Sequence, residues 1–164
     1  MKIDLDYLNR SPLLGVHSKS VRLNTGAVVT FPLISDIELI AGKTKALVER
    51  VAVRDLHDVN RLATHVPALM AAGDARLLRR VILYYLSVSA PFPRPLRVAD
   101  RFANRGREVV DQLYPMLRGD DRPTLDYMIA TAESYLSVVS APNDDAETQY
   151  MERAGRQAPA SPSS

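Results

Sequence analysis

The chain has 164 residues, of which 46% are hydrophobic, and carries a net charge of +2 at pH 7. This length and composition are typical of one domain with its own core. Cysteine is absent, which excludes disulfide bonds and thiolate metal sites, and the three histidines lack the spacing of metal ligands. Any bound metal would therefore need carboxylate ligands, which favour magnesium or manganese.

Hydropathy gives no sign of a membrane protein. No apolar run is long enough to cross a bilayer, and the N-terminal MKIDLDYLNR is charged and alternating rather than a cleavable signal. We therefore expect a cytoplasmic protein, without a membrane partner, and a monomer.

Charge is divided unevenly along the second half of the chain. Residues 75–107 hold eight arginines and one acid, which gives +7, and residues 108–155 hold ten acids and three arginines, which gives −7. Such a division can mark one surface that attracts a polyanion beside another that repels it. Two solvated faces that neutralise one another explain it equally well.

Strand patterns occupy the first 34 residues. Residues 2–8 alternate apolar and polar side chains, the period of a half-buried strand. Two further candidates, VRLN and AVVTF, are joined at Asn24-Thr25-Gly26, where a hairpin turn is expected. Three short strands make a poor independent sheet, so residues 1–34 are expected to be the β part of a larger core.

From Ser35 onward the sequence predicts helices. Ser35-x-x-Glu38 is a capping box, and the helix that it opens runs to about Val51. Further helices are expected from near Asp55 and over 74–88, 96–117, 123–140 and 146–154, with a break at PFPRP. The ending APASPSS predicts disorder over 156–164. The predicted fold is therefore α+β, a small β fragment over 1–34 followed by a helical bundle over 35–155.

One face of the helix 35–51 is continuous and largely apolar at 100° per residue, and it is expected to be buried. It consists of Ile37, Ile40, Ala41, Thr44, Leu47, Val48 and Val51. Lys45 lies on one flank with its i+4 partner Glu49. Lys43 and Arg50 share the opposite flank, where their own helix offers no acid beyond Asp36.

Gly42 lies beside Lys43, and a glycine inside a helix costs roughly 1 kcal/mol relative to alanine. Close approach of another backbone or of a ligand would explain this residue, and so would simple tolerance. Farther along the chain, Tyr84 and Tyr85 are expected in the core of the helix 74–88 rather than as a base-stacking platform.

The segment RDLHD follows the lysine helix at once. Asp55 suits an N-cap and Asp58 a third helical position, where the helix dipole favours carboxylates regardless of function. Arg54 and Asp58 are also four residues apart and can pair. Alternatively, a cationic edge followed by two carboxylates can serve phosphate transfer, with a lysine for phosphate oxygens and an acid for a metal or an attacking hydroxyl. His57 is expected at the surface.

The pattern Ala41-x-Lys43-x-x-Ala46-Leu47-x-x-Arg50-x-x-x-Arg54-Asp55-Leu56-x-Asp58 is the most specific feature of the sequence. Together with the preceding Pro-Leu-Ile-Ser and Ile-Asp-Leu-Asp-Tyr-Leu strands, it resembles the AbiEii/MenT nucleotidyltransferase toxins. These belong to the polymerase-β-like superfamily and occur in bacterial toxin–antitoxin and phage-abortive systems. The resemblance covers roughly residues 1–63, beyond which family members share helices rather than motifs.

The resemblance implies transfer of a nucleotide from an NTP, most often CTP or UTP, to an acceptor with the help of Mg²⁺. In MenT-type members the acceptor is the 3′ end of tRNA, and a cognate antitoxin is expected. Lys43 matches the lysine that holds the triphosphate, and Asp58 matches the late essential aspartate. Arg50, Arg54 and Asp55 match motif positions that are either structural or catalytic. For the catalytic alternative we expect the two arginines to bind the nucleotide and Asp55 to take part in catalysis.

Asp4 and Asp6 lie on the strand that would supply a further metal-facing carboxylate. Family members carry, upstream of this strand, a Gly-Gly or Gly-Ser turn and an Asp-x-Asp strand that binds two magnesium ions, and no such segment is found here. The chain is therefore expected to be the C-terminal portion of such an enzyme. Two-metal catalysis without the primary ligands should fail.

A basic stripe offers a surface for RNA. Arg94, Arg97, Arg101 and Arg105 follow i, i+3 and i+4 spacing, so one helix face can meet successive phosphates. A solvated face without a ligand accounts for the stripe equally well.

Three functions remain open. The first is a nucleotidyltransferase toxin, or the larger part of one, that acts on tRNA. The second is a non-catalytic helical remnant that binds RNA or a partner protein. The third, an antitoxin, is disfavoured because the antitoxins of these pairs do not carry the lysine and Arg-Asp-x-x-Asp pattern.

Overall fold

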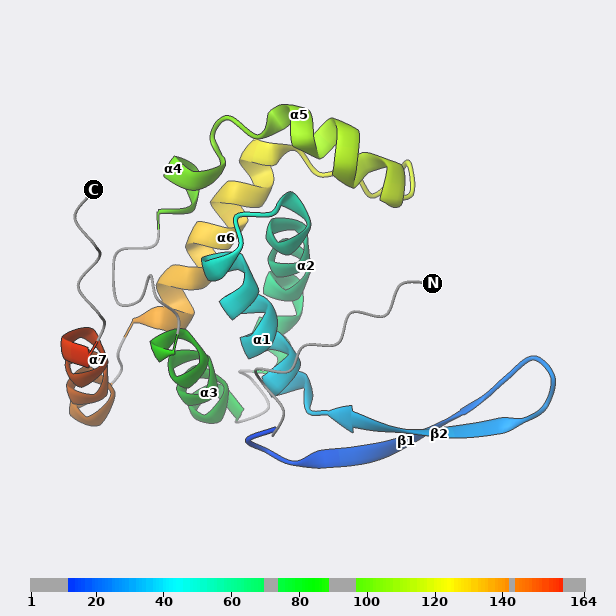
Figure 1. Cartoon of the computed structure of the whole chain (residues 1–164), viewed down its shortest axis with the longest axis horizontal. Coiled ribbons are helices and arrows are strands. Elements are labelled where there is room, and N and C mark those ends of the chain that lie inside the picture. The colour runs from blue at the N-terminus through cyan, green and yellow to red at the C-terminus, as the bar shows by residue number, and fades with distance from the viewer. Residues whose placement is uncertain (1–11, 70–73, 89–96, 142–143, 158–164) are drawn as a thin grey trace.

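A computed structural model of the chain describes residues 12–69, 74–88, 97–141 and 144–157 (Figure 1). Two strands come first and helices follow, which confirms the α+β class with a small β part. The elements are β1 (Val16–Arg22), β2 (Val28–Ile34), α1 (Asp36–Glu49), α2 (Val53–Leu69), α3 (Ala75–Ser87), α4 (Val98–Phe102), α5 (Gly106–Glu108), α6 (Leu125–Ser140) and α7 (Asp145–Gln157). The strand expected over residues 2–8 lies outside the described residues, as does the tail from residue 158.

β1 and β2 form an antiparallel hairpin whose pairs run from Val16↔Ile34 to Arg22↔Val28. Gly26, in the turn, has φ +84°, a left-handed conformation that glycine adopts without strain. The hairpin predicted around Asn24-Thr25-Gly26 is therefore confirmed, with longer strands than the sequence indicated. It extends away from the helices (Figure 1), and nearly all of its side chains are exposed.

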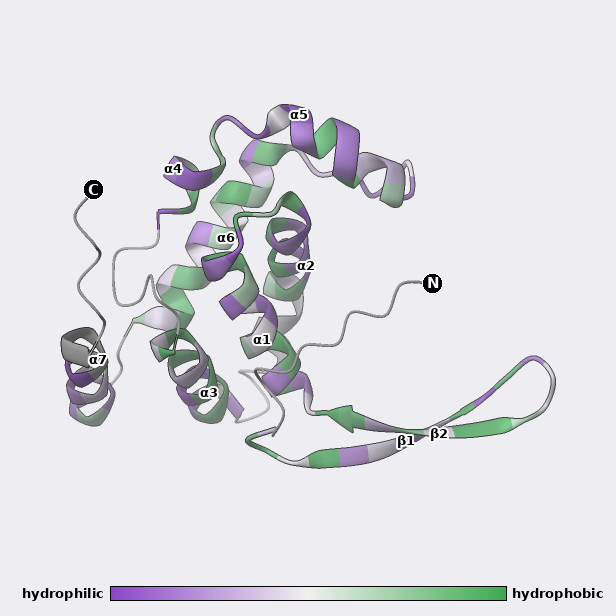
Figure 2. Cartoon of the chain, in the orientation of Figure 1, coloured by the Kyte–Doolittle hydropathy of each residue, from purple (hydrophilic) through white to green (hydrophobic). Residues whose placement is uncertain are grey.

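The hydrophobic core lies among the helices, where α1 packs against α2 and α3, and α6 packs against α2, α3 and α4. The predicted stripe of α1 is buried from Ile37 to Val48, whereas Val51 is only partly buried. Figure 2 shows apolar residues along the helices and also in the hairpin, where most of the large apolar side chains are exposed. Within the described ranges, no helix is both long enough and apolar enough to span a membrane.

Thr44 is the one hydroxyl in this buried stripe, and its polar atom is satisfied. Its Oγ1 donates to Ile40 O at 2.8 Å and lies 2.7 Å from Tyr135 Oη of α6. Burial raises the pKa of Tyr135 to about 12, so the phenol remains a hydrogen-bonding group over the physiological range. This contact joins α1 to α6 through the middle of the core.

The N-terminus of α1 confirms half of the predicted capping box. Ser35 Oγ accepts a hydrogen bond from Glu38 N at 3.2 Å, as expected of an N-cap serine. The expected reciprocal bond from the Glu38 carboxylate to the helix start is wrong. Glu38 Oε1 instead accepts from Leu13 N and from Tyr85 Oη, because the carboxylate turns toward the segment before β1 and toward α3.

The single helix predicted over 96–117 is also wrong. The chain forms the short helices α4 and α5, then a π-helical turn (Val109–Leu113) and a 3₁₀ turn (Tyr114–Met116). Asn104 and Gly106 are poor helix formers, and Pro115 lacks the amide hydrogen that a regular helix needs. These breakers outweigh the helical periodicity of the segment.

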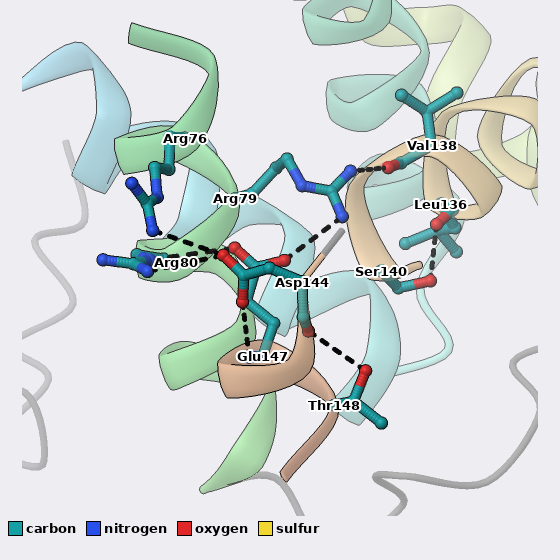
Figure 3. Close-up of polar contacts among 9 residues, drawn as sticks. All are labelled: Arg76, Arg79, Arg80, Leu136, Val138, Ser140, Asp144, Glu147 and Thr148. Carbon is teal, nitrogen blue, oxygen red and sulfur yellow. Dashed lines mark hydrogen bonds and ion pairs between the residues drawn. The ribbon is translucent and has the colours of Figure 1, made fainter. Parts of the chain in front are cut away.

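Helix α7 is attached to α3 by charged residues, shown in Figure 3. Arg79 and Glu147, each with only 4% of its side chain exposed, form an ion pair of 3.5 Å. Arg76 and Arg80 pair with Asp144 at 3.3 and 3.6 Å. We call these five residues the α3–α7 cluster. Here the basic and acidic parts of the chain neutralise one another, the second of the two explanations offered by their charge.

Candidate functional site

A cavity of about 710 Å³ opens between the base of the hairpin, α1, the first turns of α2, and α3. Its volume is within the usual range of ligand pockets, about 300–1,000 Å³. The charged residues that line it are Lys43, Arg50, Arg54, Asp55, Asp58 and Glu38, and the larger apolar ones include Pro12, Val16, Pro32, Ile34, Leu39 and Tyr85. All five motif residues predicted from the sequence therefore line one cavity.

Lys43 and Asp58 form an ion pair across the α1–α2 junction. Lys43 Nζ lies 2.6 Å from Asp58 Oδ2, and the side chains are 42% and 36% exposed. The sequence had offered Arg54 as the partner of Asp58, but α1 packs beside α2 and brings Lys43 closer. A pair this exposed contributes about 0–1 kcal/mol to stability, so either group can exchange its partner for a ligand.

Arg50 and Arg54 add positive charge to the same end of the cavity. Both are exposed, and within the described ranges neither guanidinium forms an ion pair or a side-chain hydrogen bond. Arg50 follows the last turn of α1, and its backbone N donates to Ala46 O. The two guanidinium groups are thus available to an anion next to Lys43.

Asp55 is buried in the first turn of α2 rather than at the predicted N-cap, because the helix begins two residues earlier, at Val53. Its Oδ2 has no hydrogen-bond partner among the described residues. Burial raises the pKa of Asp55, while the neighbouring Arg50 and Arg54 oppose this change. Asp55 is thus a more basic carboxylate than an exposed aspartate.

The prediction that His57 lies at the surface is wrong. The side chain is buried, and burial lowers its pKa. Helix α2 packs against both α1 and α6, so more of its circumference is covered than one amphipathic stripe would indicate. His57 does not line the cavity and is not part of the site.

The lining residues that the sequence did not assign to the site include Glu38, Gly42 and Tyr85. Glu38 is 1% exposed, and its Oε2 has no hydrogen-bond partner among the described residues. The signal in the sequence was a carboxylate next to the apolar stripe, and the predicted capping box had accounted for this carboxylate. Tyr85 was expected in the core and is half-buried, whereas its neighbour Tyr84, also expected there, is exposed.

Gly42 leaves open space in the floor of the cavity. A Cβ atom built on this residue meets no heavy atom within 4 Å. Close approach of another backbone, one of the explanations offered for this glycine, is therefore not seen in the described part of the chain. Room for a ligand and simple tolerance remain.

The predicted surface pair on the other flank of α1 is confirmed in part. Lys45 Nζ lies 3.7 Å from Glu49 Oε1, but the lysine side chain is only 14% exposed. Lys45 does not line the cavity, so two lysines of one helix have separate surroundings.

The predicted RNA stripe does not lie on one helix face. Arg94 lies outside the described residues, and Arg97 is exposed just before α4. Arg101 donates to Val48 O at the end of α1, and Arg105 donates both to Glu108 Oε1 and to Oε2 at 2.9 and 2.8 Å. The helix is interrupted between α4 and α5, so Arg101 and Arg105 do not lie on one helix.

Magnesium ligands are not assembled by the residues that the structure describes. Within these ranges, no group of three or more His, Asp or Glu side chains is placed to hold a metal ion. Of the two motif carboxylates, Asp58 is paired with Lys43, and burial of Asp55 favours its neutral form. Asp4 and Asp6 lie outside the described residues. The described carboxylates therefore do not fit a magnesium site by themselves.

Comparison with known proteins assigns the chain to a family. The sequence profile described as nucleotidyl transferase AbiEii toxin, type IV TA system, matches residues 1–147, which include the hairpin, the cavity and α1 to α6. No curated protein and no solved structure matches the chain. Nucleotidyltransferases of this kind generally use Mg²⁺ and an NTP, and a type IV toxin has a cognate antitoxin. The chain belongs to the AbiEii nucleotidyltransferase toxin family of type IV toxin–antitoxin systems.

Proposed function

We propose that this protein is a toxin that transfers a nucleotide from CTP or UTP to the 3′ end of tRNA. A tRNA substrate would place it in the cytoplasm, where its cognate antitoxin would restrain it. The observation that carries the proposal is the exposed ion pair of Lys43 and Asp58, in a cavity that also holds Arg50 and Arg54.

The cationic end of the cavity suits a triphosphate. Lys43, Arg50 and Arg54 lie around one opening, and the two guanidinium groups can bind phosphate oxygens in a bidentate manner. Hydrogen bonds to charged groups contribute about 1.5–3 kcal/mol, whereas the exposed Lys43–Asp58 pair contributes about 0–1 kcal/mol. A phosphate group would therefore replace Asp58 as the ion-pair partner of Lys43.

Once phosphate has replaced it as the partner of Lys43, the Asp58 carboxylate can act as a general base. The acceptor hydroxyl oxygen attacks the α-phosphorus, the bond from that phosphorus to the bridging oxygen breaks, and pyrophosphate leaves with the bonding electrons. The hydroxyl proton passes to the Asp58 carboxylate. Asp55 is the alternative acceptor of this proton, because burial raises its pKa and makes it the stronger base.

Two other parts of the proposal rest on the family resemblance, for the metal ligands, and on residue spacing in the sequence, for the RNA contacts. We propose Asp4 and Asp6 as metal ligands, and no step above depends on them. For RNA contact we propose Arg94, Arg97, Arg101 and Arg105. Arg97 is exposed, whereas Arg101 and Arg105 already have protein partners.

A transfer assay with matched lysine variants tests the proposal. The purified chain is incubated with CTP or UTP labelled at the α-phosphate, magnesium and total tRNA. Against the expectation from the sequence that two-metal catalysis should fail, the proposal requires wild type and Lys45→Ala to label the tRNA, and Lys43→Ala and Asp58→Asn not to do so. Lys45 is the matched control because it lies two residues from Lys43, is also paired with an acid, and does not line the cavity.

Two results would count against the proposal. Equal labelling by Lys43→Ala and wild type would remove the proposed role of the cavity. No labelling by wild type would favour the second function, a helical protein that binds RNA or a partner without transferring a nucleotide.

A further inference from the structure

The end of the cavity away from the arginines is apolar but contains a buried carboxylate. Its apolar lining comes from the segment before β1, the base of the hairpin and α3, and includes Pro12, Val16, Pro32, Ile34 and Tyr85. Glu38 lies among these residues with 1% of its surface exposed. An ionisable side chain this deeply buried needs hydrogen-bonding partners.

Only one oxygen of Glu38 has partners among the described residues. Oε1 accepts from Leu13 N and from Tyr85 Oη, the latter at 3.3 Å. Oε2 is equally inaccessible to solvent and has none. A buried acceptor that lacks a hydrogen bond costs about 1–3 kcal/mol, so a ligand donor that reached Oε2 would relieve this cost. Because Oε2 is closed to solvent, the Glu38 side chain must turn toward the cavity to form that bond.

Helix α1 connects this acceptor to the cationic end. Glu38 and Arg50 are twelve positions apart, about 18 Å along the axis at 1.5 Å per residue. Gly42 and Ala46 lie between them at i+4 and i+8 from Glu38, on neighbouring turns, and both line the cavity. Their small size leaves a path along the helix, and a Cβ added at Gly42 meets only open space.

An elongated ligand with one anionic end and one flat, largely apolar end matches this division. We propose that Glu38 Oε2 accepts a hydrogen bond from the nucleoside part of the bound NTP and thereby contributes to nucleotide selection. This inference rests on the proposed function, because it takes the phosphates to lie at Lys43, Arg50 and Arg54.

In CTP the donor has two sources. It is either the exocyclic amine of a base such as cytosine or a ribose hydroxyl. Uracil presents a carbonyl oxygen where cytosine presents its amine, and a carboxylate oxygen cannot bond to it. If Glu38 bonds to the base, the protein should therefore bind CTP more tightly than UTP. If Glu38 bonds to the sugar, the protein should bind ribonucleotides more tightly than dideoxynucleotides.

Glu38→Gln is the sharpest variant. The amide oxygen can keep the bonds from Leu13 and Tyr85, while the amide nitrogen replaces the unpaired oxygen by a donor. Dissociation constants of CTP, UTP and 2′,3′-dideoxy-CTP are measured by calorimetry for wild type and Glu38→Gln. We expect about a tenfold or greater loss of CTP affinity in the variant, the effect of one charge-assisted hydrogen bond.

The other two nucleotides identify the donor. If Glu38 reads the amine, dideoxy-CTP loses affinity as CTP does, and UTP binds the variant at least as well as wild type. If Glu38 reads a ribose hydroxyl, CTP and UTP lose affinity together, and dideoxy-CTP binds both proteins equally weakly. Either pattern supports the proposal.

Unchanged affinities for all three nucleotides in a folded Glu38→Gln variant would overturn this inference and leave the proposed function intact. If the variant does not fold, the affinities of wild type alone test the inference. Wild type must then bind CTP about tenfold more tightly than UTP or than dideoxy-CTP. Equal affinities overturn the inference. A wild-type chain that binds none of the nucleotides overturns the inference and the proposed function together.

Discussion

The cavity pair of Lys43 and Asp58 and the buried pair of Arg79 and Glu147 join the same kinds of charge in very different surroundings. The cavity pair is 42% and 36% exposed, and its atoms face an open space. The buried pair is 4% exposed on each side, and Arg79 also donates to Val138 O (Figure 3). One pair can exchange partners with a ligand, whereas the other attaches α7 to the rest of the fold.

The two regions also differ in the partners of their carboxylate oxygens. In the α3–α7 cluster the acids meet several arginines, and Asp144 Oδ1 also accepts from Glu147 N at 2.8 Å. At the cavity, Asp55 and Glu38 each keep one buried oxygen without a hydrogen bond among the described residues. Arg79 in the cluster also keeps buried nitrogens, Nε and Nη2, without a hydrogen bond in the described part of the chain, but it forms an ion pair with Glu147. Asp55 and Glu38 form no ion pair among the described residues, and this difference separates the candidate binding site from the structural cluster.

The largest effect is expected from Glu147→Ala. Removal of this carboxylate leaves the Arg79 charge buried without its acid, a change that costs about 3–5 kcal/mol in the free energy of unfolding. Urea denaturation measures it. The matched control is Glu152→Ala, at an exposed position of the same helix, which should change stability by no more than about 0.5 kcal/mol. Equal losses in the two variants would contradict the structural role given to the α3–α7 cluster.

Asp58→Asn should separate nucleotide binding from transfer. It frees Lys43 from its ion pair, so the affinity for CTP should rise, by at most about fivefold for an exposed pair. Transfer to tRNA should be lost, because the carboxylate that accepts the proton is gone. Calorimetry and the transfer assay check the two halves. Weaker CTP binding would mean that Asp58 helps to hold the nucleotide instead of competing with it.

Asp55→Asn should alter the pH dependence of stability. Burial raises the folded-state pKa of Asp55 above 3.8, so the folded chain holds this proton more firmly than the unfolded chain. The resulting stability is present below pH 3.8 and is lost as the pH rises through the folded-state pKa. The asparagine variant avoids this loss, so it should melt at a higher temperature than wild type at neutral pH.

Thermal unfolding across pH measures this effect, and the advantage of Asp55→Asn should disappear below pH 3.8. Asp126→Asn, at an exposed position in the first turn of α6, is the control and should show no such gain. A constant difference between wild type and Asp55→Asn at all pH values would show that titration of Asp55 is not its cause.

The smallest effect is expected from Gly42→Ala. Alanine inside a helix is favoured over glycine by about 1 kcal/mol, and the new methyl group meets no atom within 4 Å. The variant should therefore be more stable in urea. The methyl group also enters the floor of the cavity, so CTP should bind more weakly. Higher stability with unchanged CTP affinity would indicate that the nucleotide does not pass over this turn of α1.

Local patterns predicted the parts of the fold that depend on neighbours in sequence. The period of α1 identified its buried face, Ser35 identified its start, and the turn at Gly26 identified the hairpin. The residues of the site were predictable to the same extent, because Lys43 and Asp58 belong to a motif with fixed spacing.

Tertiary packing decided what the sequence did not predict. Asp58 pairs with Lys43 rather than Arg54 because α2 packs beside α1. His57 is buried because α2 is covered by two other helices. Glu38 was read as a cap from its three-residue spacing, but a residue of a distant helix, Tyr85, takes part in holding its carboxylate.

The central claim is that Lys43 binds the phosphates of a nucleotide at this cavity. It is tested most directly by calorimetry with CTP and with cytidine, for wild type, Lys43→Ala and Lys45→Ala. The account predicts that Lys43→Ala weakens CTP binding by about tenfold or more, leaves cytidine binding unchanged, and differs in this from Lys45→Ala, which binds both as wild type does. Equal CTP affinities in the two lysine variants would contradict it.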